Sequence, residues 1–209
     1  MMKSKFLLFV LFIFTDLSTS EVKAQQKTIL VNAAVNSYNL HNISYQPVIE
    51  DIRAGTGFNI GFGYEQPLFN KTSLILGFDI SQRNYHNANF AWLKNAFRHN
   101  YLSIPVNLNY YFFKNFAIQT GMQYDHLIFK QKFVFYKDNT EQESAFTKFD
   151  IGINSGLRFQ FYNFELNSSI NYGLIKIYDL SGTDPMTGIV IRNFAKSYMY
   201  KFGVSYLFK

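Results

Sequence analysis

The twelve residues 101–112, YLSIPVNLNYYF, alternate between apolar and polar side chains almost without error. Because successive side chains of a β-strand point to opposite faces, a period of two over this length predicts a half-buried strand. The face that meets water decides the class of protein: a soluble β-domain buries its apolar face, and a membrane barrel turns that face outward. The apolar side comprises Leu102, Ile104, Val106, Leu108, Tyr110 and Phe112.

Alternation and turn signals predict eight strands along the chain. Three connections are tight, at 68–72, 113–115 and 162–163, and each contains an Asn that suits the left-handed backbone of a hairpin turn. An even strand number, with short turns at one end and long loops at the other, is typical of an antiparallel up-and-down barrel. The predicted strands are 27–38, 54–66, 73–85, 100–112, 116–129, 148–161, 164–178 and 197–208, and the long loops are 39–53, 86–99, 130–147 and 179–196.

The sizes of the residues on the two faces predict which face is outside. The chain has 24 Phe and 15 Tyr, and its charged fraction is 16%, where about 25% is usual. An eight-stranded barrel is just wide enough inside for side chains, so the large apolar side chains of this chain, roughly twenty or more, would crowd its interior. We therefore expect Phe62, Leu76 and Val106 outside and Asn107 and Asp150 inside. The predicted fold class is all-β, an eight-stranded antiparallel up-and-down transmembrane β-barrel.

Two local features refine this expectation. The outward register of the fifth strand reaches Lys130 and Lys132 directly after Ile128, which predicts a membrane border there. Pro105 lies inside the strand of clearest alternation, although a closed barrel has no free edge for a residue that lacks an N–H. We expect a local bulge at Pro105.

The N-terminus has the pattern of a secretory signal peptide, with basic residues, an apolar run from Phe6 to Phe14, and small residues before Gln25. We predict a signal peptide at 1–24 and one outer-membrane β-barrel domain at 25–209. No later apolar run approaches the 18 residues of a membrane helix, and the chain has no Cys, so disulfides are excluded.

Several charged residues fall on the inward face, and in so narrow a barrel we expect them to pair and fill the core rather than line a passage. This lumen charge network comprises Asp79, Asp125, Asp150, Arg158, Glu165 and Lys201.

No catalytic, metal or cofactor site is expected. Asp125 and His126 are adjacent, but neighbours in a strand point to opposite faces and cannot form a dyad. Nucleophile, phosphate and dinucleotide motifs are absent. The four histidines fall near the long loops without the spacing of a metal site: His41, His86, His99 and His126.

The loops carry aromatic residues that suit a contact surface for a partner, or alternatively interfacial anchors of the aromatic girdle. This possible loop contact surface comprises Phe90, Trp92, Phe97, Phe133 and Phe135.

The segment Tyr101-Leu102-Ser103-Ile104-Pro105, followed by Asn109 to Phe112, Gly121, Asp150-Ile151-Gly152 and the ending Tyr206-Leu207-Phe208, resembles the PorT-like outer-membrane β-barrel family. The resemblance covers nearly the whole mature chain. It implies a small eight-stranded barrel related in architecture to the OmpA membrane domain, with one member type in a protein-secretion and gliding apparatus. The terminal Lys209 departs from the aromatic residue that often ends such barrels.

We expect a non-catalytic protein with a structural, adhesive or assembly-partner role, located in the outer membrane with both termini periplasmic. Its partners would be outer-membrane lipid and possibly a protein at the extracellular loops or the periplasmic end. The charge of +6 is dispersed, which gives no sign of nucleic-acid binding. The alternatives are a rim-active enzyme on lipid or peptide, a narrow channel, and a soluble barrel of the lipocalin type. Oligomeric state stays open.

Overall fold

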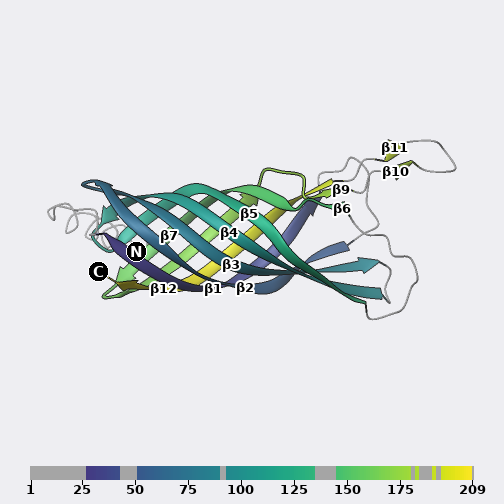
Figure 1. Ribbon diagram of the computed structural model, residues 1–209, viewed down its shortest axis with the longest axis horizontal. Helices are drawn as coiled ribbons and strands as arrows, with labels where there is room; N and C mark the ends of the chain where they lie inside the picture. The colour runs from purple at the N-terminus through teal and green to yellow at the C-terminus, as the bar shows by residue number, and fades with distance from the viewer. Residues whose placement is uncertain are drawn as a thin grey trace, which may run out of the picture.

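In the computed structural model, eight long strands form a closed antiparallel barrel (Figure 1). The structure describes residues 27–42, 51–89, 93–134, 145–179, 182–183, 190–191 and 194–208. Each long strand pairs with the next, and β1 pairs with β12 to close the sheet, which confirms the predicted fold class. The long strands are β1 (Thr28–Asn42), β2 (Asp51–Phe69), β3 (Thr72–Asn89), β4 (Leu93–Phe113), β5 (Phe116–Val134), β7 (Phe149–Phe161), β8 (Phe164–Gly173) and β12 (Phe194–Phe208).

Of four two-residue strands, three lie within segments predicted as loops, and β9 spans the end of the predicted strand 164–178 and the start of the next loop. β9 continues the sheet beside β12 and also pairs with β6, and β10 pairs with β11. Their bounds are β6 (Ala145–Phe146), β9 (Tyr178–Asp179), β10 (Gly182–Thr183) and β11 (Val190–Ile191). No helix in the described ranges is long and apolar enough to cross a membrane. The predicted signal peptide at 1–24 lies outside the described residues.

The polarity of the barrel is inverted, as the sizes of the residues predicted. Phe62, Leu76 and Val106 are 56%, 54% and 41% exposed, and Asn107 and Asp150 are buried inside. Outward apolar side chains continue around all eight long strands. Such a surface is stable against lipid, and closure of the sheet supplies the backbone partners that lipid cannot.

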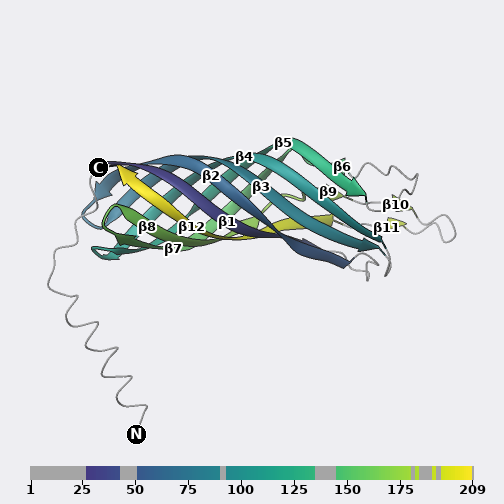
Figure 2. The same cartoon turned by 90° about the horizontal axis from the view of Figure 1, so that it is seen from below.

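Strands β2 to β5 extend farther at the loop end than their neighbours (Figures 1 and 2). β4 pairs with β3 as far as Leu93–Asn89 and with β5 as far as Asn95–Val134, whereas the β5–β7 ladder ends at His126–Phe149. Most of the loop predicted at 86–99 is therefore strand, and so is the start of the loop at 130–147. The sequence does not reveal this extension, because the residues of the extension do not alternate between apolar and polar.

A bulge at the base of this extension changes the register of β5. The β4–β5 pairs shift between Tyr101–Leu127 and Asn100–Phe129, so Lys130 pairs with His99, whose side chain is buried on the inner side. Residues that pair across antiparallel strands share a face. Lys130 therefore does not continue the outward register of Ile128, although its side chain is exposed. A membrane border at this level stays a prediction.

The proline in β4 is accommodated without an inserted residue, so the bulge predicted at Pro105 is wrong. The β3–β4 ladder lacks the pair opposite Pro105, but the register is the same on both sides, at Leu76–Val106 and Asp79–Ser103. Opposite the proline is Gly77, and a Cβ there would lie 2.7 Å from Cγ of Pro105. The glycine thus supplies the space that the proline ring occupies.

The turn between β7 and β8 also differs from expectation. Among the non-glycine residues that the structure describes, Tyr162 is the one with a left-handed backbone, with a φ of 53°. Asn163 does not adopt this conformation. The Gln160 side chain donates a hydrogen bond to the Tyr162 carbonyl at 3.0 Å, which helps to hold this turn.

Candidate functional site: the closed interior of the barrel

The interior holds eight buried or partly buried charged side chains that come from six different strands. Inward positions alternate with lipid-facing ones along each strand, and each of these six strands contributes one or two of the charges. Among the described residues the interior acids are Glu65, Asp79, Asp125, Asp150 and Glu165, and the interior bases are Arg83, Arg158 and Lys201.

The Arg158 cluster lies toward the turn end and consists of Arg158, Glu65, Glu165, Ser73 and Tyr111. The Arg158 guanidinium is ion-paired to Glu165 and, at 3.1 Å, to Glu65. Glu65 also accepts hydrogen bonds from the Ser73 hydroxyl and, at 2.5 Å, from the Tyr111 hydroxyl. One cation therefore balances two carboxylates, and hydroxyl donors stabilise the remaining negative charge.

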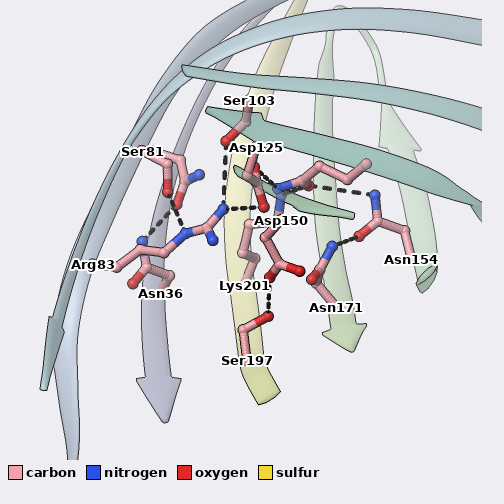
Figure 3. A network of polar contacts seen from close by, with 12 residues as sticks. Asn36, Ser81, Arg83, Ser103, Asp125, Asp150, Asn154, Asn171, Ser197 and Lys201 are labelled. Atoms are coloured by element: carbon pink, nitrogen blue, oxygen red, sulfur yellow. Dashed lines mark hydrogen bonds and ion pairs between the residues drawn. The ribbon is translucent and has the colours of Figure 1, made fainter. Parts of the chain in front are cut away.

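The Arg83 cluster lies toward the loop end and includes Arg83, Asp125, Asp150 and Ser197 (Figure 3). The rings of Tyr38 and Tyr101 complete it. Arg83 is ion-paired to Asp125 at 2.7 Å. Its guanidinium carbon lies 4.3 Å from the ring centroid of Tyr101 and 5.5 Å from that of Tyr38, so both rings contribute cation–π contacts.

Asp150 pairs directly with Asp125 across β5 and β7 and accepts a hydrogen bond from Ser197. Two carboxylates that face each other across strands repel, and within the described chain Asp150 forms no ion pair of its own. The Arg83 cluster is therefore less well compensated than the Arg158 cluster.

Lys201 is joined to the Arg83 cluster through Gln123. Its ammonium donates to Gln123 Oε1 at 3.0 Å, and Gln123 Nε2 in turn donates to Asp125 at 2.6 Å. Asp79, on β3, accepts from Asn32 at 3.0 Å. Polar contacts thus continue through the middle of the barrel, with amide side chains between the charges.

Apolar side chains close the interior at both ends. At the turn end, Leu30, Ile75 and Leu207 pack together. At the loop end a larger cluster forms a lid over the charges, which the inward-polar prediction did not anticipate. The lid consists of Tyr38, Leu40, Tyr85, Ile177, Ala195 and Met199, with Phe97 packed against it.

A cavity of about 90 Å³ lies between these closures. Its lining includes Asp79, Arg158, Glu165 and Lys201, together with several asparagines. Such a cavity has room for several water molecules and offers them polar partners, whereas a drug-sized ligand needs about 300 Å³ or more. The interior is thus a packed polar core that holds internal space for solvent.

The structure places all six members of the predicted lumen charge network inside the barrel. Four of them fall into the two clusters, and Asp79 and Lys201 contact amide side chains instead. The sequence analysis missed Glu65 and Arg83, although each has the inward parity of its strand. Applying the same inward–outward alternation as far as the strand ends identifies both residues as inward-facing.

Of the predicted loop contact surface, the structure describes the side chain of Phe97 alone, so the surface stays a prediction. Phe97 packs on the Tyr85 ring, with centroids 4.8 Å apart and planes 6° apart. Phe133 pairs with Ala96, the neighbour of Phe97, rather than with Phe97 itself. Phe90, Trp92 and Phe135 lie outside the residues for which the structure gives a description.

The histidines do not form a site. His99 is buried between the Tyr85 and Tyr101 rings, and His126 is exposed with Nδ1 3.4 Å from the Tyr124 hydroxyl, on the opposite face from Asp125. Across the described ranges, no group of three or more metal-binding side chains could hold an ion.

A family model described as an outer membrane protein beta-barrel domain matches residues 23–179. No curated protein matches the sequence. Solved structures similar to this chain include Ail of Yersinia pestis in complex with a heparin analogue, with 15% identity, a TM-score of 0.48, and coverage of 88% of this chain and 100% of Ail. They also include OprG of Pseudomonas aeruginosa, with 10% identity, a TM-score of 0.48, and coverage of 90% and 99%. Neisserial surface protein A has 14% identity, a TM-score of 0.44, and coverage of 88% and 100%.

Proposed function

Because this chain belongs to the outer membrane protein beta-barrel domain family and is an outer-membrane protein, we propose that it is a non-catalytic, non-conducting barrel that acts through its loop end. On this proposal the barrel is an anchor, and the extension of β2 to β5 is the part that meets a partner. The role is structural, adhesive or in assembly.

The closed interior carries this proposal. A pore needs a continuous wet path, but here Arg83 and the lid of Tyr38, Tyr85 and Met199 lie above the cavity, and Leu30, Ile75 and Leu207 lie below it. Both ion-paired arginines are buried, and separating a buried pair costs about 3–5 kcal/mol. Passage of a solute would require breaking such pairs and moving the lid.

The loop-end extension supports a contact role. Four paired strands hold it as a sheet beyond the point where β7 and β8 end, so it presents a rigid surface rather than separate loops. Barrels of this class have short periplasmic turns and longer extracellular loops. We therefore assign the extension to the cell exterior and both termini to the periplasm, after removal of a signal peptide at 1–24.

We further propose that the chain is a PorT-like member of its family. The support is the segment Tyr101 to Pro105, whose proline fits against Gly77. That fit gives a structural reason for a proline within this strand.

Two experiments test the proposal. Purified protein in planar bilayers should give no discrete conductance, and reproducible openings would contradict the non-conducting assignment. In cells, a photo-crosslinker at Lys130 in the extension should give discrete protein adducts, whereas one at Lys114 in a short turn should not. Adducts at Lys114 alone would move the contact to the opposite end and overturn the assigned role of the extension.

A further inference from the structure

One strand edge at the loop end is paired on one side only. The β5–β7 ladder ends at His126–Phe149, whereas β5 continues to Val134 and stays paired with β4 over this length. On its other side, the run 128–134 has no strand partner within the described chain, and β6, the next strand, pairs with β9 instead. We call residues 128–134 the β5 edge.

The β5 edge presents backbone groups that can receive a further strand. A strand directs N–H and C=O groups to each side, so this run leaves a row of donors and acceptors about 23 Å long. At its base the β4–β5 register shifts between Tyr101–Leu127 and Asn100–Phe129. Bulges at barrel rims turn a strand or end its pairing. Here the bulge separates the part of β5 that is paired on both sides from the part that is paired on one.

The charges beside the β5 edge are of one sign. Lys130 lies on the edge and is exposed, and at the foot of the edge the Lys148 carbonyl accepts the Leu127 N–H at 2.7 Å. Arg98 lies one strand inward, opposite Gln131. Every acidic side chain that the structure describes is buried in the interior of the barrel. An acidic segment is therefore complementary to this edge.

Two other occupants match the β5 edge less well. If a second copy paired its own edge antiparallel to the first around Gln131, Lys130 of one copy would lie opposite Lys132 of the other. Like charges in opposite positions destabilise a pair of strands. Hydrocarbon cannot supply partners for the free N–H and C=O groups. An acidic polypeptide matches both the backbone groups and the charges.

We propose that the β5 edge binds an extended acidic segment of a partner protein, which adds to the sheet as a further strand. This inference rests on the proposed function and names the chemistry of the partner that the extension meets. Backbone hydrogen bonds supply the affinity of such an added strand. Acidic side chains at alternate positions, on the same side of the sheet as Lys130, supply its specificity.

Peptide binding to the full chain in phosphatidylcholine nanodiscs tests strand addition without a cellular partner. The probes are a fluorescent acidic peptide, TEVEVEVT, its basic counterpart TKVKVKVT, and the acidic peptide with every amide N-methylated. Anisotropy measures affinity, and hydrogen exchange with mass spectrometry locates the protected amides. The test variant is Lys130→Glu, and the matched control is Lys114→Glu in a short turn. Heat-dependent gel mobility reports folding of each variant.

The acidic peptide should bind the wild type and slow exchange in the β5 edge. Lys130→Glu should weaken this binding about fivefold, because an attractive cross-strand pair becomes repulsive, and Lys114→Glu should leave it unchanged. Equal binding of the N-methylated peptide would overturn strand addition, and equal binding of the basic peptide would overturn the choice of an acidic partner. If Lys130→Glu does not fold, these comparisons on the wild type decide.

The outcome is separate from that of the proposed function. If the acidic peptide does not bind, or protects only other segments, the β5 edge is not the site of strand addition. The proposed function still stands in that case if a photo-crosslinker at Lys130 captures a protein in cells. If the peptide binds as expected but no adduct forms in cells, the edge has the proposed chemistry and the assigned role of the extension fails.

Discussion

The two arginine clusters inside the barrel compensate buried charge in different ways. Arg158 is shared by two carboxylates, one of which also accepts hydrogen bonds from Ser73 and Tyr111. Arg83 has one carboxylate partner and is flanked by two tyrosine rings. The first cluster therefore has an excess of negative charge stabilised by donors, and the second has a cation stabilised in part by aromatic faces.

This difference predicts that the two ends of the interior respond differently to loss of charge. In the Arg158 cluster, near the turns, two buried carboxylates depend on the charge of one arginine. Near the loops, Arg83 and Asp125 depend on each other, and Asp150 depends on Ser197 instead. The loop-end cluster should tolerate loss of the Asp150 carboxylate, whereas the turn-end cluster should not tolerate loss of its cation.

The largest effect is expected for Arg158→Met, which leaves Glu65 and Glu165 buried without their cation. The free energy of unfolding should fall by at least about 3–5 kcal/mol, measured by urea unfolding in lipid vesicles. Adding Glu65→Gln and Glu165→Gln should recover most of the loss. A triple variant no more stable than Arg158→Met would show that the charges are not the cause.

Arg83→Met should destabilise less, by about 3 kcal/mol, because a single carboxylate loses its ion pair. The double variant with Asp125→Asn should be more stable than either single variant in the same unfolding assay. A loss as large as that of Arg158→Met would remove the distinction between the clusters.

Removing a tyrosine hydroxyl tests whether that residue acts as a hydrogen-bond donor or through its aromatic ring. Tyr111→Phe takes a donor from the Glu65 carboxylate and should cost about 1.5–3 kcal/mol, the range for hydrogen bonds to charged groups. Tyr101→Phe keeps the ring beside Arg83 and should cost only about 0.5–1.5 kcal/mol. The opposite order would contradict the assignment of Tyr101 as an aromatic neighbour of the cation.

The smallest effect is expected for Asp150→Asn. The substitution removes the repulsion between Asp150 and Asp125, and stability should rise by up to about 1 kcal/mol. Asp125→Asn is the matched control and should be strongly destabilising, because it leaves Arg83 buried without a carboxylate. Equal losses in both variants would mean that Asp150 also supports Arg83.

The sequence predicted the strands, the closure and the inverted faces because alternation is a local property of the chain. It did not predict that Arg158 reaches Glu65, which is 93 residues away, since that contact depends on the stagger of strands around the barrel. The lid was missed for a different reason. Tyr38 and Tyr85 are large inward residues near strand ends, where the sequence pattern equally predicts a tyrosine of the aromatic girdle.

The extension of β2 to β5 shows a further limit. Beyond the membrane, strands need no apolar outward face, so residues such as Asn95 to His99 form paired strands without the alternation that reveals strands elsewhere. The sequence shows Pro105, but it does not show how the fold accommodates the proline ring, because Gly77, which leaves space for the ring, is on another strand.

The central claim is that apolar side chains cover the barrel and face lipid. The chain has no cysteine, so single substitutions give unambiguous labels. Spin labels at Val106→Cys and Leu108→Cys in vesicles should be accessible to oxygen dissolved in lipid, and labels at Asn107→Cys and Asn109→Cys should be shielded from it. The account predicts this two-residue period along β4, and the reverse pattern, with 107 and 109 in lipid, would contradict it.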